Sequence, residues 1–317
     1  MDALSDILKF TRWSANTYFS SAGKGPWCMQ VLYRPQGIFH AILKGRCYLS
    51  QSGNPEIIVL EEGDVIAFPT GGEHKISGTV KNLKLSADNV IRVPQDDDVM
   101  VLKHGAVNFS QRKPDEHSTA SVQWVSGIMS YDTSIQHPLL KELPCSIHVG
   151  EQEKDVRQIL QSVIRVIASE NKAEMPGAEL ATDLMTEVLF LQLLRCHMQK
   201  STQPMGYFAA LSHRHIGVAL NLIHSERDGS LTVDSLCSAA AMSRTRFNAC
   251  FAQLVGETPK VYLSNTRLLR AKTKLQNSQE TIPRIADAAG YSSDSSFSKA
   301  VKKHFGMTPG ELRKSGQ

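Results

Sequence analysis

Hydrophobic and polar residues follow two different periods along the chain. Between residues 28 and about 110, short β-rich runs are separated by Gly, Pro and Asn, which is typical of strands joined by turns. From residue 151, apolar residues instead recur every three or four positions, as on one face of an amphipathic helix. The pattern therefore predicts a β-sandwich or barrel followed by helices. The predicted strands cover residues 29–33, 38–43, 47–49, 57–60 and 65–68.

Two amphipathic helices are predicted after the strands. The first begins near residue 151, the second covers 177–199, and residues 200–206 form the predicted linker to a final helical segment. The apolar surface of the second helix is wide for a helix that packs on one side only. Pairing with another helix, in the same chain or in a second subunit, would bury it. The apolar face of the first helix comprises Val156, Ile159, Leu160, Val163, Ile164 and Ile167, and the stripe of the second comprises Leu180, Leu184, Val188, Leu191 and Leu194.

The last third of the chain contains an internal duplication. The tetrapeptide GETP at 256–259 recurs 50 residues later as GMTP at 306–309. An amphipathic helix precedes each copy, at 244–255 and at 294–305, and an Ala-rich helix precedes each of these, at 233–241 and at 283–289. An Ala-rich helix, a short turn and a second helix make up a helix-turn-helix unit. The sequence predicts two such units, joined by a helix from Thr258 to about Asn277.

The positive charge of the chain is confined to this duplicated segment. Residues 209–317 carry 15 Lys and Arg against 8 Asp and Glu, whereas the segments 1–150 and 151–208 are each slightly negative. A basic module on a near-neutral body suggests a polyanionic partner, usually nucleic acid, with a merely solvated basic surface as the alternative. The joining helix, roughly 30 Å long, approaches the 34–36 Å of one DNA turn. It could therefore hold two recognition helices in successive segments of the major groove.

The second helix of each unit presents polar residues away from its core stripe. Asn can bond adenine, Arg can bond guanine, and Ser, Thr and Lys can bond bases or phosphates. Two such faces on a basic repeat favour double-stranded DNA as the partner. The outward residues are Arg244, Thr245, Asn248 and Ala249 in the first unit and Asp294, Ser295, Ser298, Lys299 and Lys302 in the second.

The stretch 212–314 resembles the DNA-binding domain of the AraC/XylS family of bacterial transcription regulators. The motifs are MSRTRFNACFAQLVGETPKVYLSNTRLLRAKTKL at 242–275 and IADAAGYSSDSSFSKAVKKHFGMTPGELR at 285–313. The resemblance implies seven helices that contact promoter DNA through both recognition helices, and a regulator that activates transcription with RNA polymerase. Thr245 and Ala249 are small, whereas some relatives carry larger polar side chains that contact bases at these positions. We therefore expect the first recognition helix to contact bases through Arg244 and Asn248.

The segment 37–78 resembles a cupin barrel, and up to about residue 150 it is similar to the sensor domains fused to such regulators. Metal-binding cupins supply two His separated by one residue, a carboxylate and a later His. The second of these ligands is missing here, so we expect no metal, and we expect His40 and His74 to line the pocket of an unknown small-molecule signal. A cupin metalloenzyme with a basic helical tail is the alternative. The resemblance rests on His40, Gly45, Gly63, Asp64, Pro69 and His74, and on residues 127–149, which resemble the end of such sensors.

Six cysteines lie far apart and form no C-x-x-C pair. Cys28 and Cys47 fall on predicted strands and Cys145 near the end of the sensor, so a thiol-based redox signal is a further alternative. No apolar run approaches the roughly 18–20 residues of a membrane span. No secretory signal, phosphate-binding loop or hydrolase motif is present either. We therefore expect a cytoplasmic protein without catalytic residues or a cofactor.

The sequence as a whole predicts an α+β multidomain chain. A cupin-like β-barrel sensor is expected in residues 1–150, and a helical dimerisation segment with a linker in 151–208. An all-α DNA-binding domain with two helix-turn-helix units is expected in 209–317. The apolar stripes of the middle segment favour a homodimer, because a large exposed apolar surface usually marks an interface. The alternative is that both helices pack on the cupin barrel of the same chain.

Overall fold

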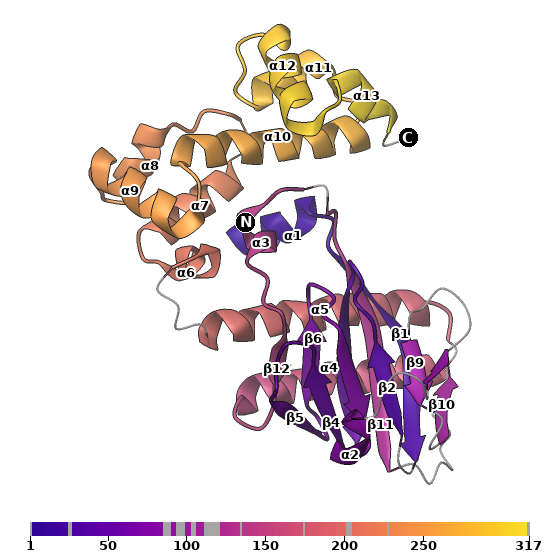
Figure 1. Cartoon of the computed structure of the whole chain (residues 1–317). Helices are drawn as coiled ribbons and strands as arrows, with labels where there is room; N and C mark the ends of the chain where they lie inside the picture. The colour runs from indigo at the N-terminus through magenta and orange to yellow at the C-terminus, as the bar shows by residue number, and fades with distance from the viewer. Residues whose placement is uncertain are drawn as a thin grey trace. The chain divides into compact units, whose positions relative to one another are not determined.

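The computed structural model in Figure 1 describes residues 2–24, 27–84, 90–92, 99–102, 106–110, 121–133, 135–173, 175–200, 205–226 and 228–315. The chain forms two compact units, each built from separate segments of the chain. The sheet unit comprises Ser14–Tyr131 and Leu143–Lys200, and the helical unit comprises Met1–Trp13, Asp132–Glu142 and Ser201–Gln317. Two segments that the sequence analysis assigned to the sensor, the N-terminal 13 residues and residues 132–142, thus belong to the helical unit. The domain boundaries after residues 150 and 208 stay a prediction.

Among its described residues, the sheet unit contains two six-stranded sheets, with strand orders β10-β1-β11-β3-β6-β12 and β5-β4-β7-β2-β9-β8. All strand pairs recorded in them are antiparallel. The strands predicted from the alternation of apolar residues and turn signals correspond to β2 through β6, and these predictions are confirmed. The strands are β1 Ser14–Lys24, β2 Cys28–Val31, β3 Gly37–Lys44, β4 Arg46–Gln51, β5 Ile57–Glu61, β6 Val65–Phe68, β7 His74–Ser77, β8 Val90–Arg92, β9 Val99–Leu102, β10 Ala106–Ser110, β11 Val122–Ser130 and β12 Ile147–Val149, with a short helix α2 at Val80–Leu83.

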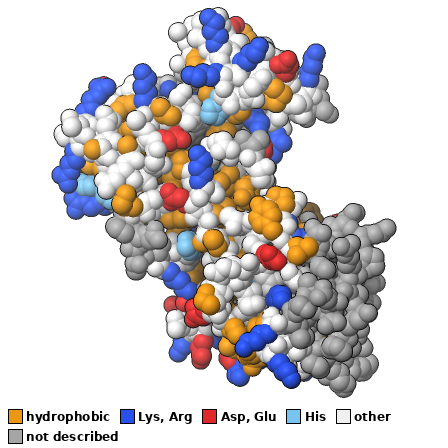
Figure 2. All heavy atoms as spheres, viewed as in Figure 1, with side chains coloured by type: hydrophobic (Ala, Val, Ile, Leu, Met, Phe, Trp, Pro, Cys, Tyr) orange, Lys and Arg blue, Asp and Glu red, His pale blue; other side chains and the backbone are white. Residues whose placement is uncertain are grey.

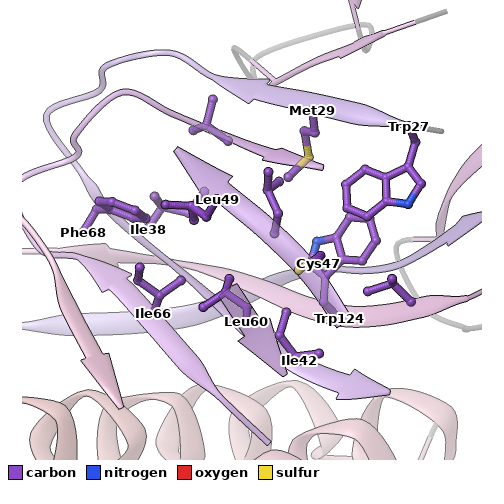
Figure 3. Packing of buried hydrophobic residues seen from close by; sticks show 13 residues of the cluster. Trp27, Met29, Ile38, Ile42, Cys47, Leu49, Leu60, Ile66, Phe68 and Trp124 are labelled. Atoms are coloured by element: carbon purple, nitrogen blue, oxygen red, sulfur yellow. The ribbon is translucent and has the colours of Figure 1, made fainter. Parts of the chain in front are cut away.

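A single apolar cluster draws residues from both sheets (Figure 3). The indole rings of Trp27 and Trp124 stack with their centroids 4.6 Å apart and a 14° angle between their planes, and both side chains are completely buried. Such aromatic pairs contribute more than their buried area alone. Gly23 lies against this pair, and a Cβ atom at that position would stand 2.3 Å from Nε1 of Trp27, so only glycine fits there.

Two long helices complete the sheet unit, α4 at Lys154–Ala173 and α5 at Ala178–Lys200. Both were predicted from the helical period, and both are confirmed. The predicted stripe of α5 is not a single surface, however. Leu194 is completely buried, whereas Leu180 and Leu184 are 64% and 48% exposed. The helix buries a different face, and Leu189, Phe190 and Leu193 form it.

The helical unit contains two helix-turn-helix units on either side of a long helix, α10 (Figure 1). The helices predicted from the duplication correspond to α8 through α12, and they are confirmed within a residue or two at each end. Helices from the N-terminal segment and from residues 132–142 join them. The elements are α1 Ala3–Phe10, α3 Pro138–Lys141, α6 Tyr207–Ser212, α7 Ile216–Ser225, α8 Val233–Ala239, α9 Arg244–Val255, α10 Pro259–Asn277, α11 Ile282–Ala288, α12 Asp294–Phe305 and α13 Pro309–Lys314.

A buried hydrogen-bonded cluster around Tyr262 of α10 joins these helices. Its hydroxyl lies 2.8 Å from Nε2 of His224, 3.0 Å from Nε2 of His137 and 2.5 Å from the hydroxyl of Tyr207. Nδ1 of His224 in turn lies 3.0 Å from Oδ2 of Asp6, on α1. All five residues are buried. The cluster therefore links α1, the start of α3, α6 and α7 to α10.

One arrangement of protons satisfies every group in this cluster. Nδ1 of His137 accepts the backbone N–H of Leu139, so its Nε2–H donates to Tyr262. His224 donates from Nδ1 to the Asp6 carboxylate, so its Nε2 accepts the hydroxyl proton of Tyr262. The Tyr262 oxygen then accepts from both His137 and Tyr207. Burial keeps the pKa of His137 well below its usual range, so its imidazole is neutral in this arrangement.

Tyr262→Phe tests how much this cluster stabilises the helical unit. The change leaves three buried polar groups without their partner, and each such group costs about 1–3 kcal/mol. We expect the free energy of unfolding, measured in urea, to fall by about 3 kcal/mol. Tyr291→Phe is the matched control, because the half-buried ring of Tyr291 packs edge-on against Phe297 in the same unit. It should cost less than about 0.5 kcal/mol. Equal small losses for both variants would contradict this role for the hydroxyl.

Candidate nucleic-acid interface

The first helix-turn-helix unit consists of α8 and α9. Thr232 caps α8 in a capping box with Ser235, and Ala241 in the following turn takes a positive φ of 50°. Helix α9 ends at Gly256, whose φ of 80° suits glycine. Phe247 and Phe251 are completely buried with their ring centroids 5.6 Å apart, so α9 is held by its apolar stripe. The opposite face is exposed, and it carries Arg244, Thr245, Asn248 and Ala249.

The second unit, α11 and α12, repeats this construction. Ser293 caps α12 by accepting the backbone N–H of Ser296, and Gly306 ends the helix at a φ of 74°. Phe297 and Val301 are completely buried. The outward positions are exposed apart from the half-buried Ser298, and they are Asp294, Ser295, Ser298, Lys299 and Lys302. The structure thus places the nine predicted DNA-contacting residues on two outward faces, one on α9 and one on α12. Their contacts with bases stay a prediction.

Positive side chains gather on the helical unit. Figure 2 shows Lys and Arg over α8 and α9 and again over α11 to α13. Arg244 is held by an ion pair with Asp234 at 2.6 Å, although both side chains are largely exposed and solvent screens the pair. Its guanidinium can therefore exchange this carboxylate for a base or a phosphate at little cost.

The predicted joining helix is α10. The side chain of Thr258 accepts the backbone N–H of Val261, and Pro259 stands in the first turn, so the predicted cap is confirmed. The helix has 19 residues, which correspond to about 29 Å. Tyr262 near its start packs edge-on against Phe251 of α9, with ring centroids 5.7 Å apart, and Leu275 near its end belongs to the apolar core of the second unit.

His40 and His74, the two residues predicted to line the small-molecule pocket of the sensor, lie in the interior of the sheet unit. His40 and His74 are 0% and 1% exposed, and their Nε2 atoms are 2.8 Å apart. The other ring nitrogens face Ser126 Oγ at 2.7 Å and the carbonyl of Gly72 at 2.8 Å. Burial lowers the pKa of His74 to about 4 and that of His40 well below its usual range, so both rings are neutral. A ligand must displace one of these partners to reach either ring, and their role in ligand binding stays a prediction.

Neither alternative chemistry gains support from the described residues. Within the part of the chain that the structure describes, no three His, Cys, Asp or Glu residues are grouped so that they could hold a metal ion. Cys28 and Cys47 are completely buried, and burial raises the pKa of their thiols to about 11 and about 12. Such thiols are protonated at neutral pH and react slowly with oxidants. Cys145 is exposed.

Sequence reasoning did not identify the polar residues that hold the helical unit together. The pattern offered a weak signal, because Tyr262 and Thr266 lie on the stripe of α10 that also contains Leu269. The side-chain partners of Tyr262, however, belong to a cluster that extends to Asp6, 256 residues away along the chain. Spacing along a single helix cannot reveal such contacts.

Comparisons with known proteins agree with this architecture. A family model described as cupin matches residues 2–199, and one described as helix-turn-helix domain matches residues 236–315. The chain is 28% identical over 315 residues to the HTH-type transcriptional regulator AlkR of Acinetobacter baylyi, with 99% of each chain covered. It is 27% identical over 324 residues to a putative AraC-like transcription regulator of Streptomyces antibioticus, again with 99% of each covered.

Two further proteins show a narrower or more distant similarity. The RCS-specific HTH-type transcriptional activator RclR of Escherichia coli is 26% identical over 277 residues, or 87% of this chain and 83% of that one. A crystal structure of a transcriptional regulator with an AraC-type DNA-binding domain from Chromobacterium violaceum is 31% identical. It covers 32% of this chain and 89% of its own, with a TM-score of 0.30. Among the described helices, none is both long and apolar enough to span a membrane.

Proposed function

We propose that both recognition helices of this protein read bases at one promoter site. The premise is that the chain belongs to the AraC family of helix-turn-helix transcription regulators with an N-terminal cupin domain. The protein is a DNA-binding transcription regulator. The observation that carries the proposal is the repeated pair of outward polar faces, on α9 and α12, within a segment of net positive charge. We assign base reading to Arg244 and Asn248 in the first face and to Ser295 and Lys299 in the second.

The regulator is proposed to activate transcription in contact with RNA polymerase, and to act without catalysis in the cytoplasm, where promoter DNA lies. The relatives support this proposal through their names, since one of them is a transcriptional activator. The signal is proposed to be a small molecule that acts on the cupin domain. A thiol signal at Cys28 or Cys47 is less suited, because burial raises the pKa of both thiols.

Asn248→Ala and Lys302→Ala separate base reading from phosphate contact. Asn248 should discriminate at a single base position, so its loss should cost about 1–3 kcal/mol there and leave other positions unchanged. Lys302→Ala should instead weaken binding to all sequences alike and reduce the slope of log affinity against log salt by about 1. Binding to a library of duplexes at several salt concentrations measures both quantities. A sequence profile of Asn248→Ala identical to that of the unaltered protein would show that Asn248 reads no base.

The protein is further proposed to be a homodimer through α4 and α5. Both helices keep apolar side chains in solvent: Ile159 and Val166 on α4 are 46% and 41% exposed, and Leu184 on α5 is 48% exposed. A second copy suits this surface, because self-complementary pairing is the commonest form of association. Two copies would also place two DNA-binding units on one promoter and raise the effective concentration of the second.

Leu180→Glu combined with Leu184→Glu tests the dimer. Both side chains are exposed in the single chain, so the fold should persist while charges enter the proposed interface. Light scattering at tens of micromolar should give a dimer for the unaltered protein and a monomer for the double variant. Val59→Glu is the control, since Val59 is an equally exposed apolar residue on β5, and it should stay dimeric. A monomeric unaltered protein at this concentration would rule the proposal out.

A further inference from the structure

Two glycines bring the loop that leads into the first helix-turn-helix unit into close backbone approach with the turn of the second. Gly229 lies in the loop between α7 and α8, ahead of the first unit, and Gly290 lies in the turn between α11 and α12 of the second. A Cβ atom on Gly229 would stand 2.6 Å from the backbone nitrogen of Gly290 and 2.8 Å from its Cα. Both residues have positive φ values, 72° and 77°. Close approach and backbone conformation therefore both require glycine at this contact.

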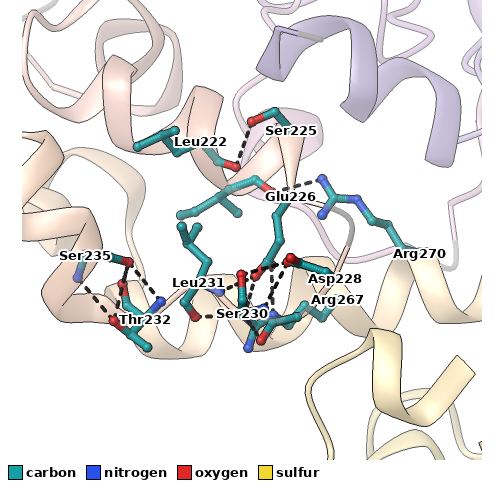
Figure 4. Close-up of polar contacts among 12 residues, drawn as sticks. Leu222, Ser225, Glu226, Asp228, Ser230, Leu231, Thr232, Ser235, Arg267 and Arg270 are labelled. Carbon is teal, nitrogen blue, oxygen red and sulfur yellow. Dashed lines mark hydrogen bonds and ion pairs between the residues drawn. The ribbon is translucent and has the colours of Figure 1, made fainter. Parts of the chain in front are cut away.

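Arg267 of α10 stabilises this contact through hydrogen bonds of its guanidinium group (Figure 4). Its Nε donates to Oε2 of Glu226 at 2.9 Å, and its Nη2 donates to Oε1 at 2.5 Å. The same Nη2 lies 2.8 Å from the carbonyl oxygens of Gly229 and Leu231. The guanidinium thus joins the end of α7 and the loop that leads into α8 to the middle of α10.

The other amino group of Arg267 faces the second unit. A Cβ atom built on Gly290 would lie 3.0 Å from Nη1 of Arg267. The ion pair beneath this contact is largely removed from water, since the side chains of Arg267 and Glu226 are 15% and 4% exposed. A guanidinium that makes a bidentate contact with a carboxylate has a fixed orientation, which a flexible ammonium does not provide.

Apolar packing joins α10 to the second unit, because Leu268 and Leu275 share a buried core with Ile285 of α11. A hollow of about 40 Å³ remains beside the ion pair, between Arg267 and Arg270 on α10 and Ala288 on α11. It has room for ordered water rather than side chains. The glycine contact and the Arg267 hydrogen bonds therefore add an oriented link to this packing.

We propose that Arg267, together with Gly229 and Gly290, is a positioning element that makes the protein specific for the number of base pairs between its two DNA subsites. The inference rests on the proposed function, in which α9 and α12 read one duplex. DNA advances about 3.4 Å and turns by roughly 35° with each base pair, because a turn of 34–36 Å holds 10–10.5 base pairs. Two rigidly joined helices cannot follow a subsite that is displaced in this way. A single inserted pair must therefore break the contacts of one unit.

The test uses the full chain and a duplex chosen by selection from random sequences. Spacers one base pair shorter, one longer and two longer than the selected site are compared with it. We expect the unaltered protein to lose at least tenfold in affinity at each changed spacing. Arg267→Lys should flatten this profile to within about threefold, because a flexible ammonium cannot reproduce the bidentate contact with Glu226 that fixes the orientation of the guanidinium. Gly290→Ala should flatten it independently, because its Cβ atom would lie 3.0 Å from both Nη1 of Arg267 and the carbonyl oxygen of Gly229, at a φ of 77° that favours glycine.

Arg284→Lys is the matched control, since Arg284 is a 79% exposed arginine on α11, and it should keep the profile of the unaltered protein. Base substitutions within each subsite separate this inference from the proposed function. An unaltered protein that ignores all such substitutions would contradict the proposed function itself. If the unaltered protein reads both subsites, and folded Arg267→Lys or Gly290→Ala keeps its steep spacing dependence, the positioning role is wrong. Tolerance of all spacings by the unaltered protein would overturn it too.

Discussion

The hydroxyl group of Tyr262 is the point on which the architecture of the helical unit depends. It receives hydrogen bonds from His137 and Tyr207 and gives one to His224, in a region that water does not reach. A buried polar cluster of this kind stabilises only when every member has its partner. Burial raises the pKa of Tyr262 well above its usual range, so the hydroxyl keeps the proton that this arrangement needs. Helix α10 is thereby fixed to α6 and α7, while its other end packs into the second helix-turn-helix unit.

The same cluster explains why the compact units are not consecutive along the chain. Asp6 accepts hydrogen bonds from His224 and from Arg270, and these bonds hold its pKa low although burial alone would raise it. The segment that carries Asp6 leads directly into β1, and the segment that carries His137 follows β11. Ser14 and Ser130, at these two strand ends, are paired with each other in the sheet. The chain itself therefore connects one strand pair of the sheet unit to the residues around Tyr262.

Much of this organisation follows from the sequence, because its causes are local. The period of apolar residues predicts α4, α5 and β2 to β6, and the repeated Gly-x-Thr-Pro predicts both recognition helices and the cap of α10. The outward residues follow from the same helical period, so the placement of Asn248 and Lys302 needed no tertiary information. The long-range contacts did not follow, because Asp6 and His137 meet Tyr262 only in the folded chain. Leu194 illustrates the same limit, since its burial depends on which side of α5 packs against the rest of the sheet unit.

The account as a whole rests on two recognition helices that read one duplex at a fixed separation. A hydroxyl-radical footprint of the full chain, on a duplex selected from random sequences, tests this most directly. The account predicts, for each DNA-binding unit, two protected segments on one face of the DNA, centred about one helical turn of 10 base pairs apart. Such protection should persist in an excess of unrelated duplex, because base contacts discriminate between sequences. Protection that covers one segment only, or that unrelated duplex removes at equal concentration, would contradict it.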